Sequence, residues 1–194
     1  MPTPHDGAAP SAWVRRWSPL LAPGATLLDV ACGSGRHLRW FAERGLRATG
    51  IDRDATALAG LESVARIVHA DLEQGPWPLP GERFDAVIVT NYLWRPLLPA
   101  LAASLNDGGV LIYETFALGN AAFGRPRNPE FLLAPGELLR AFAQLRVLAF
   151  EDGYLDDPPR CVQRLCALRL DPATAADARL PLLPAAPGRS GSDG

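Results

Sequence analysis

The sequence predicts an α/β domain built on a mostly parallel β-sheet. Short apolar runs alternate with segments of helical periodicity between residues 11 and 170, which is the pattern of successive βα units. A glycine-containing turn joins the first apolar run to the helical segment after it, and polar residues follow the later runs. In a parallel sheet with right-handed crossovers, such turns and strand ends gather at one edge, where ligands bind.

The first half of the domain is predicted to contain three strands and three helices. Apolar residues at helical spacing indicate a lead-in helix over residues 11–21. The predicted strands span residues 26–31, 47–51 and 64–69, and the helices between them span residues 36–44 and 54–63. Gly45 is expected to end the first of these two helices and Asp54 to cap the start of the second.

The second half is predicted to end in a hairpin. Residues 84–90 form a β-branched run suited to burial on both faces of a sheet. A helix through Leu97, Leu98, Leu101 and Leu105 is expected to stop at Asp107-Gly108-Gly109. The remaining predicted elements are a strand over residues 110–116, a helix over 135–144, and strands over 146–154 and 161–170. The last two flank a proline turn, so the final strand is expected to run antiparallel.

The composition indicates one globular domain. Of 194 residues, 48% are hydrophobic and 21% are charged, and the formal net charge is −2. The domain is expected to span residues 11–170, between flexible ends at residues 1–10 and 171–194 that are rich in proline and alanine. All 19 basic residues are arginine, which excludes chemistry that needs a lysine amine.

The cysteines, histidines and apolar runs bear on the cellular compartment. The three cysteines and three histidines are scattered, which is typical neither of a disulfide framework nor of a zinc site, so no metal is expected. The N-terminus does not show a basic segment followed by an apolar one, and no uncharged apolar run approaches about 18 residues. A cytoplasmic protein that does not engage a membrane is therefore expected.

The segment Asp29-Val30-Ala31-Cys32-Gly33-Ser34-Gly35 carries the main functional signal. Gly33 and Gly35 have no Cβ, so the backbone can turn sharply and approach a ligand. The third glycine of a dinucleotide-binding motif is replaced by Leu38. The carboxylate of Asp29 would repel a pyrophosphate and attract an ammonium group. These features point to S-adenosylmethionine.

Polar residues at later strand ends fit the same ligand. Asp52 ends the second predicted strand, where a carboxylate can accept hydrogen bonds from both ribose hydroxyls. Asp71 follows the third, where its side chain and the next backbone N–H can read the edge of an adenine. Asn91 closes the fourth strand on the same rim.

Five motifs between residues 25 and 155 resemble those of class I S-adenosylmethionine-dependent methyltransferases: LLDVACGSGRH, GIDRD, ADL, FDAVIVTNYLW and LNDGGVLIYETF. The resemblance implies a three-layer Rossmann-like fold with a seven-stranded sheet in the order 3-2-1-4-5-7-6 and an antiparallel strand seven. The cofactor-binding residues that it implies are Asp29, Ala31, Gly33, Gly35, His37, Asp52, Arg53, Asp71, Leu72 and Asn91.

The resemblance implies in-line methyl transfer, with S-adenosylhomocysteine as the product. The fourth motif reads Thr90-Asn91-Tyr92-Leu93 and so departs from the N-P-P-[YF] form of amino-directed DNA and protein methylases. The net charge of −2 and the lack of a clustered basic run do not favour a nucleic acid, so a small-molecule acceptor is expected. An RNA or protein methyltransferase and a non-catalytic cofactor-binding sensor or partner subunit remain alternatives.

Residues after the fourth and fifth strands are candidates for the acceptor pocket. The pocket candidates are Tyr92, Trp94, Arg95, Phe116 and Arg125. Glu114 and Tyr92 are candidate catalytic residues, because either could accept a proton from an oxygen or nitrogen acid. Arg125 and Arg127 lie in a loop rich in glycine and proline and could pair with an anionic acceptor.

Overall fold

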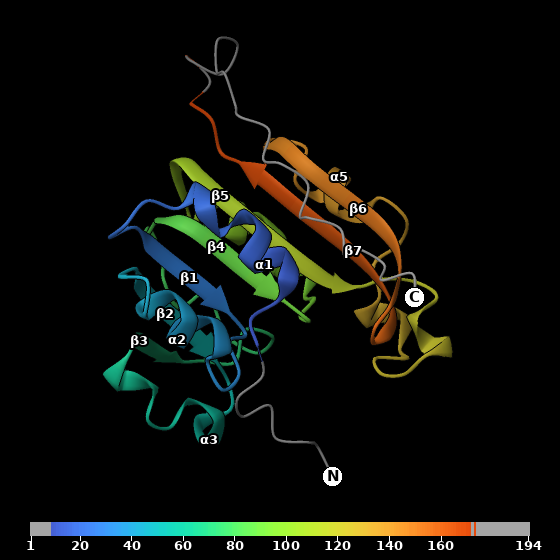
Figure 1. Cartoon of the computed structure of the whole chain (residues 1–194), viewed down its shortest axis with the longest axis horizontal. Coiled ribbons are helices and arrows are strands. Elements are labelled where there is room, and N and C mark those ends of the chain that lie inside the picture. The colour runs from blue at the N-terminus through green and yellow to red at the C-terminus, as the bar shows by residue number, and fades with distance from the viewer. Residues whose placement is uncertain (1–8, 172, 174–194) are drawn as a thin grey trace, which may run out of the picture.

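The computed structural model describes residues 9–171 and 173, and the flexible ends predicted at residues 1–10 and 171–194 lie almost entirely outside them. The predicted seven-stranded sheet is confirmed, in the order β3-β2-β1-β4-β5-β7-β6 (Figure 1). The strands are β1 Thr26–Val30, β2 Arg47–Asp52, β3 Arg66–His69, β4 Phe84–Thr90, β5 Leu105–Phe116, β6 Arg146–Asp156 and β7 Pro159–Leu168.

The pairing directions also follow the prediction. Strands β3, β2, β1, β4 and β5 pair in parallel, whereas β7 pairs antiparallel to both β5 and β6. The order reverses between β1 and β4, because β1 continues to β2 and β3 on one side and β4 to β5 on the other. A sheet of this kind binds ligands at that switch point, beyond the carboxyl ends of its strands.

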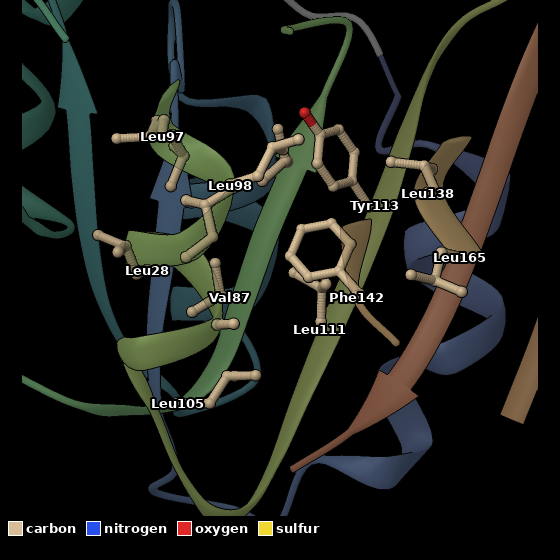
Figure 2. Close-up of a cluster of buried hydrophobic side chains, with 14 of the residues drawn as sticks. Leu28, Val87, Leu97, Leu98, Leu105, Leu111, Tyr113, Leu138, Phe142 and Leu165 are labelled. Atoms are coloured by element: carbon tan, nitrogen blue, oxygen red, sulfur yellow. The ribbon is translucent and has the colours of Figure 1, made fainter. Parts of the chain in front are cut away.

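Helices cover both faces of the sheet, which gives three layers (Figure 1). The first face packs against α1 Ala12–Trp17, α2 Arg36–Ala42 and α3 Ala55–Leu58, and the second against α4 Leu98–Ala103 and α5 Glu137–Ala141. Successive strand residues alternate between the two cores, so Leu27 joins one and Leu28 the other. Figure 2 shows the second core, where Phe142 packs beside Tyr113. Within the described residues, no helix has the length and apolar character needed to cross a bilayer.

All five helices are shorter than predicted: the helix expected over residues 11–21 spans Ala12–Trp17, and the helix expected over residues 36–44 spans Arg36–Ala42. The helix expected over residues 54–63 ends at Leu58, and a separate 3₁₀ turn, Leu61–Ser63, follows Gly60, whose φ is +80°. The helix through the leucines ends at Ala103, because Leu105 is the first residue of β5 and pairs with Phe84. The last helix spans Glu137–Ala141 rather than 135–144. Glycines before this 3₁₀ turn and before α5, and the strand pairing of Leu105 after α4, limit these helices in spite of the helical spacing of the apolar residues.

Candidate functional site

The site lies at the switch point of the sheet, where β1 and β4 end side by side. Ala31 and Asn91 directly follow these strands, with φ of +54° and +56°. They are the only non-glycine residues with positive φ in the described part of the chain. Backbone strain of this kind costs about 1–3 kcal/mol and concentrates at ligand sites. Both residues line the cleft described below.

The cleft consists of three hollows that share residues. The first, here called the adenosine hollow, has a volume of about 210 Å³. It is lined by Ala31, Asp52, Arg53, Ala70, Asp71, Leu72, Glu73 and Tyr92. Asp52 Oδ2 accepts a hydrogen bond from Gly33 N at 2.7 Å, and Oδ1 accepts one from Asp54 N at 2.9 Å. The carboxylate that ends β2 thus also braces the glycine turn after β1.

The far wall of the adenosine hollow is acidic. Asp71 Oδ1 accepts a hydrogen bond from Glu73 N at 2.9 Å, which fixes the turn after β3. Arg53 Nη1 lies 3.9 Å from a carboxylate oxygen of Asp71 and 3.9 Å from one of Glu73. Leu72 supplies a buried apolar surface between them. The predicted residues Asp52, Arg53, Asp71 and Leu72 therefore meet in one hollow.

Tyr92 faces the adenosine hollow, although the sequence placed it on the acceptor side. Its hydroxyl oxygen is buried and has no hydrogen-bond partner among the described residues. Burial raises the pKa of this phenol, and the nearby carboxylates of Glu73 and Asp71 raise it further. The phenol therefore stays neutral near pH 7 and is a hydrogen-bond donor rather than a proton acceptor.

The second hollow, here called the glycine-loop hollow, has a volume of about 180 Å³. It is lined by Ala31, Cys32, Gly33, Ser34, Arg36, Thr90 and Asn91. The two glycines of the turn differ in role. A Cβ built on Gly33 would meet no atom within 4 Å, whereas one on Gly35 would lie 2.7 Å from Leu61 Cδ2. Gly33 thus faces the cleft, and Gly35 allows close packing behind it.

The third hollow, here called the arginine hollow, is the largest, at about 850 Å³. It is lined by Arg36, Asn91, Phe116, Asn120, Gly124, Arg125, Pro126, Arg127, Asn128, Phe131, Pro158, Pro159 and Arg160. Ala31 is common to the first two hollows, while Arg36 and Asn91 are common to the second and third. Phe116 and Arg125, which the sequence analysis placed in the acceptor pocket, both line the arginine hollow.

Two other predicted pocket residues do not line any of the three hollows. Arg95 Nε donates to Glu137 Oε1 at 2.7 Å, and its Nη2 donates to Leu132 O at 3.0 Å. The guanidinium is therefore engaged in anchoring the segment before α5. Trp94 is partly buried against the core beneath this segment. Both residues support the wall of the site instead of facing an acceptor.

Two predicted cofactor residues lie behind the cleft rather than in it. Asp29 and His37 are each 1% exposed and line none of the three hollows. Ser11 N donates to His37 Nε2 at 3.2 Å, which leaves the ring proton on Nδ1, 3.6 Å from Asp29 Oδ2. That oxygen has no hydrogen-bond partner among the described residues.

Glu114 is also closed from the cleft, at 3% exposure. Its Oε1 accepts a hydrogen bond from Ser11 Oγ at 3.0 Å, and its Oε2 accepts one from Arg164 Nε. Arg164 Nη1 in turn donates to Glu151 Oε2 at 3.1 Å. Because both carboxylate oxygens of Glu114 are engaged, the structure offers an acceptor no free proton-accepting side chain at this position.

Sequence reasoning missed several lining residues. Glu73 and Thr90 lie next to or near predicted site residues, so their closeness to the ends of β3 and β4 could have identified them as lining residues. Arg36 follows the glycine turn directly, and its Nη2 lies 3.4 Å from Thr90 Oγ1. Arg160 had no local signal, because only the antiparallel pairing of β7 brings it to this rim.

With this geometry in place, comparisons with known proteins are informative. Residues 27–109 match the family described as a methyltransferase domain. The tRNA U34 carboxymethyltransferase of Shewanella amazonensis is 33% identical over 117 residues, 53% of this chain and 36% of that protein. The malonyl-[acyl-carrier protein] O-methyltransferase of Serratia marcescens is 36% identical over 110 residues, 50% of this chain and 41% of that protein. The chain thus spans less than half the length of these curated relatives.

Solved structures share the fold at low sequence identity. TehB from Haemophilus influenzae superposes with a TM-score of 0.71 at 17% identity, covering 85% of this chain and 64% of TehB. The glycopeptide N-methyltransferase MtfA, solved in complex with sinefungin, has a TM-score of 0.59 at 16% identity, covering 85% of this chain and 89% of MtfA. The predicted Rossmann-like methyltransferase fold is confirmed.

Proposed function

Because the chain carries a methyltransferase domain on the fold of the class I S-adenosylmethionine-dependent methyltransferases, we propose that it transfers a methyl group from S-adenosylmethionine to a small molecule. One observation carries the proposal. The three hollows adjoin one another, because Ala31 lines both the first and the second, and Arg36 and Asn91 line both the second and the third. A methyl donor and its acceptor must meet at such a junction.

The residues of the first two hollows suit an adenosyl cofactor. Asp52 would receive the ribose hydroxyls, and Asp71 with Leu72 would border the adenine. Tyr92 also lines this hollow, and its hydroxyl is a buried donor without a hydrogen-bond partner among the described residues. The open space above Gly33 leaves room for the amino acid part. When bound, S-adenosylmethionine supplies a methyl group on a sulfonium whose leaving group is the neutral thioether S-adenosylhomocysteine.

The protein's part in the reaction is positioning. Departure of a neutral thioether needs no general acid, so holding the acceptor in line beside Asn91 and excluding water supply most of the rate. The proton of an oxygen or nitrogen acceptor would leave to solvent or to a group on the acceptor itself. Glu114 is ion-paired, and the raised pKa of Tyr92 keeps its phenol neutral.

The size of the arginine hollow supports a small acceptor. A volume of about 850 Å³ falls within the range of small-molecule pockets. Two curated relatives carry names that refer to a tRNA and to an acyl-carrier protein. Macromolecular acceptors are therefore the alternatives that the experiments must separate.

Ligand binding tests the proposal directly. We expect S-adenosylhomocysteine, at about 100 times its Kd, to stabilise the full chain by about 2.7 kcal/mol, and NAD to have no effect. The change Asp52→Asn should weaken S-adenosylhomocysteine binding about tenfold or more in calorimetric titration, because a charge-assisted hydrogen bond contributes about 1.5–3 kcal/mol. Asp107→Asn is the matched control, since Asp107 is exposed and pairs with Arg169 at the other end of the sheet.

Two results would contradict the assignment. One is stabilisation by NAD but not by S-adenosylhomocysteine. The other is equal S-adenosylhomocysteine affinity in the Asp52→Asn and wild-type proteins.

A further inference from the structure

The arginine hollow has an unusual charge. Four arginines line it: Arg36 at the start of α2, Arg125 and Arg127 in the loop after β5, and Arg160 in β7. None of its lining residues carries a carboxylate. Asp156 and Asp157 belong to the neighbouring turn between β6 and β7 but do not line the hollow. The wall facing a ligand is therefore positive, although the chain as a whole carries a net charge of −2.

The arginines of the described residues differ in whether they form an ion pair. Within residues 9–171, none of the four that line the hollow forms an ion pair, whereas Arg66, Arg95 and Arg164 each pair with a glutamate. Arg160 Nε is buried without a hydrogen-bond partner in the same part of the chain. A buried donor left unpaired costs free energy, and so does the mutual repulsion of cations in one hollow. Both costs are offset when an anion binds.

The chain brings these arginines together from three distant segments. Cys161 N donates to Asn120 Oδ1 at 3.3 Å, and Ala117 N donates to Cys161 O at 2.9 Å. These bonds tie the loop after β5 to the start of β7, and Figure 1 shows the two side by side. Arg36 borders the glycine-loop hollow as well, so the positive wall begins where a cofactor's reactive end would lie.

We infer that the arginine hollow binds a small methyl acceptor that carries a carboxylate or phosphate group on an apolar body. This inference rests on the proposed methyltransferase function and specifies its acceptor. Guanidinium groups bind both oxyanions through paired, charge-assisted hydrogen bonds. Phe116, Phe131 and the prolines of the hollow supply the apolar surface, and Asn91 lies where the hollow meets the cofactor path.

Paired probes that differ in charge test the inference. The full chain, saturated with S-adenosylhomocysteine, is titrated calorimetrically with benzoate, phenyl phosphate and the neutral benzamide. We expect at least one of the two anions to bind at least tenfold more tightly than benzamide. The double variant Arg125→Gln/Arg160→Gln should lose at least tenfold of this anion affinity and keep its affinity for S-adenosylhomocysteine within about twofold. Arg83→Gln is the control, because Arg83 is exposed just before β4, at the opposite end of the sheet.

The outcomes separate this inference from the function on which it rests. If S-adenosylhomocysteine does not bind the wild-type protein, the methyltransferase proposal fails. If it binds but benzamide matches both anions, or the double variant binds the anions as well as wild type, the anionic acceptor is overturned. Binding of a tRNA anticodon stem-loop with steep salt dependence, without binding of either small anion, would overturn it in favour of RNA.

Discussion

Removal of the Tyr92 hydroxyl is expected to change protein stability and ligand binding in opposite directions. It is buried without a partner among the described residues, which costs about 1–3 kcal/mol in the ligand-free protein. Tyr92→Phe should therefore raise the free energy of unfolding by about 1 kcal/mol in urea titrations and weaken S-adenosylhomocysteine binding several-fold.

Tyr113→Phe is the matched control for this change. It removes a hydroxyl that donates to Tyr92 O at 2.9 Å, so it should lower stability instead. If Tyr92→Phe destabilises the protein as much as Tyr113→Phe does, the Tyr92 hydroxyl has a partner in solution and is not reserved for a ligand.

The position of a residue at the rim of the sheet was predictable where side-chain chemistry and strand position coincide. Asp52, Asp71 and Asn91 follow strand ends on one rim, and the alternation of a strand fixes which way its end faces. The positions of His37 and Arg95 outside the three hollows were not predictable, because their hydrogen-bond partners, Ser11 and Glu137, are distant in sequence. No local pattern encodes such partners.

The turn between β1 and α2 yields a prediction at the scale of elements. Gly33 and Gly35 both have positive φ, +53° and +75°, so alanine is strained at either. Only Gly35 is also crowded, since a Cβ there would lie 2.7 Å from a methyl of Leu61. Gly33→Ala should cost about 1–2 kcal/mol of stability and Gly35→Ala about 1–3 kcal/mol more, measured by chemical denaturation. Equal losses would show that Leu61 moves aside freely.

The amino ends of three strands are joined by Asp85, which makes their stability dependent on pH. Its carboxylate accepts hydrogen bonds from Thr26 N at 2.8 Å and from Asn106 Nδ2 at 2.8 Å. The bond from Thr26 N, followed by that from Asn106, holds the pKa of Asp85 below its usual value. A depressed carboxyl pKa adds stability at neutral pH that is lost as the pH falls through the folded-state pKa.

Asp85→Asn should therefore destabilise the protein by about 1–2 kcal/mol at pH 7. The difference from wild type should shrink as the pH is lowered below about 4, because the wild-type carboxyl then takes up a proton. Urea titrations of both proteins at pH 7 and pH 3 measure this. A difference that stays constant between the two pH values would mean that the charge of Asp85 does not matter.

The bounds of a strand or helix could be predicted from the sequence where burial determines the backbone conformation. The β-branched run of β4 matched its predicted bounds, since burial on both faces leaves a strand no other arrangement. The lengths of the helices were overestimated, because the helical spacing of apolar residues continues through Leu61 and Leu105 after the helical backbone has ended.

At the scale of the whole molecule, the strand order followed from the resemblance to a family, whereas the arginine hollow could be found only in the structure. Its arginines come from three segments that lie between positions 36 and 160 of the chain.

Across the whole molecule, α1 connects the two halves of the sheet through a chain of polar contacts. Ser11 N reaches His37 in α2, and Ser11 Oγ reaches Glu114 in β5. Glu114 continues to Arg164 in β7, whose side chain is 12% exposed, and from there to Glu151 in β6. A buried ion pair broken on one side leaves an uncompensated charge, which costs about 3–5 kcal/mol.

Glu114→Gln should consequently lower the free energy of unfolding by about 2–4 kcal/mol, slightly less than a fully isolated pair because Arg164 keeps Glu151. Glu151→Gln removes the exposed end of the same network and should cost less than about 1 kcal/mol. Urea titrations of the two variants, which differ from wild type by the same chemical change, make the comparison. A loss below about 1 kcal/mol in Glu114→Gln would show that this contact does not join the halves of the sheet, and would return Glu114 to consideration as a proton acceptor.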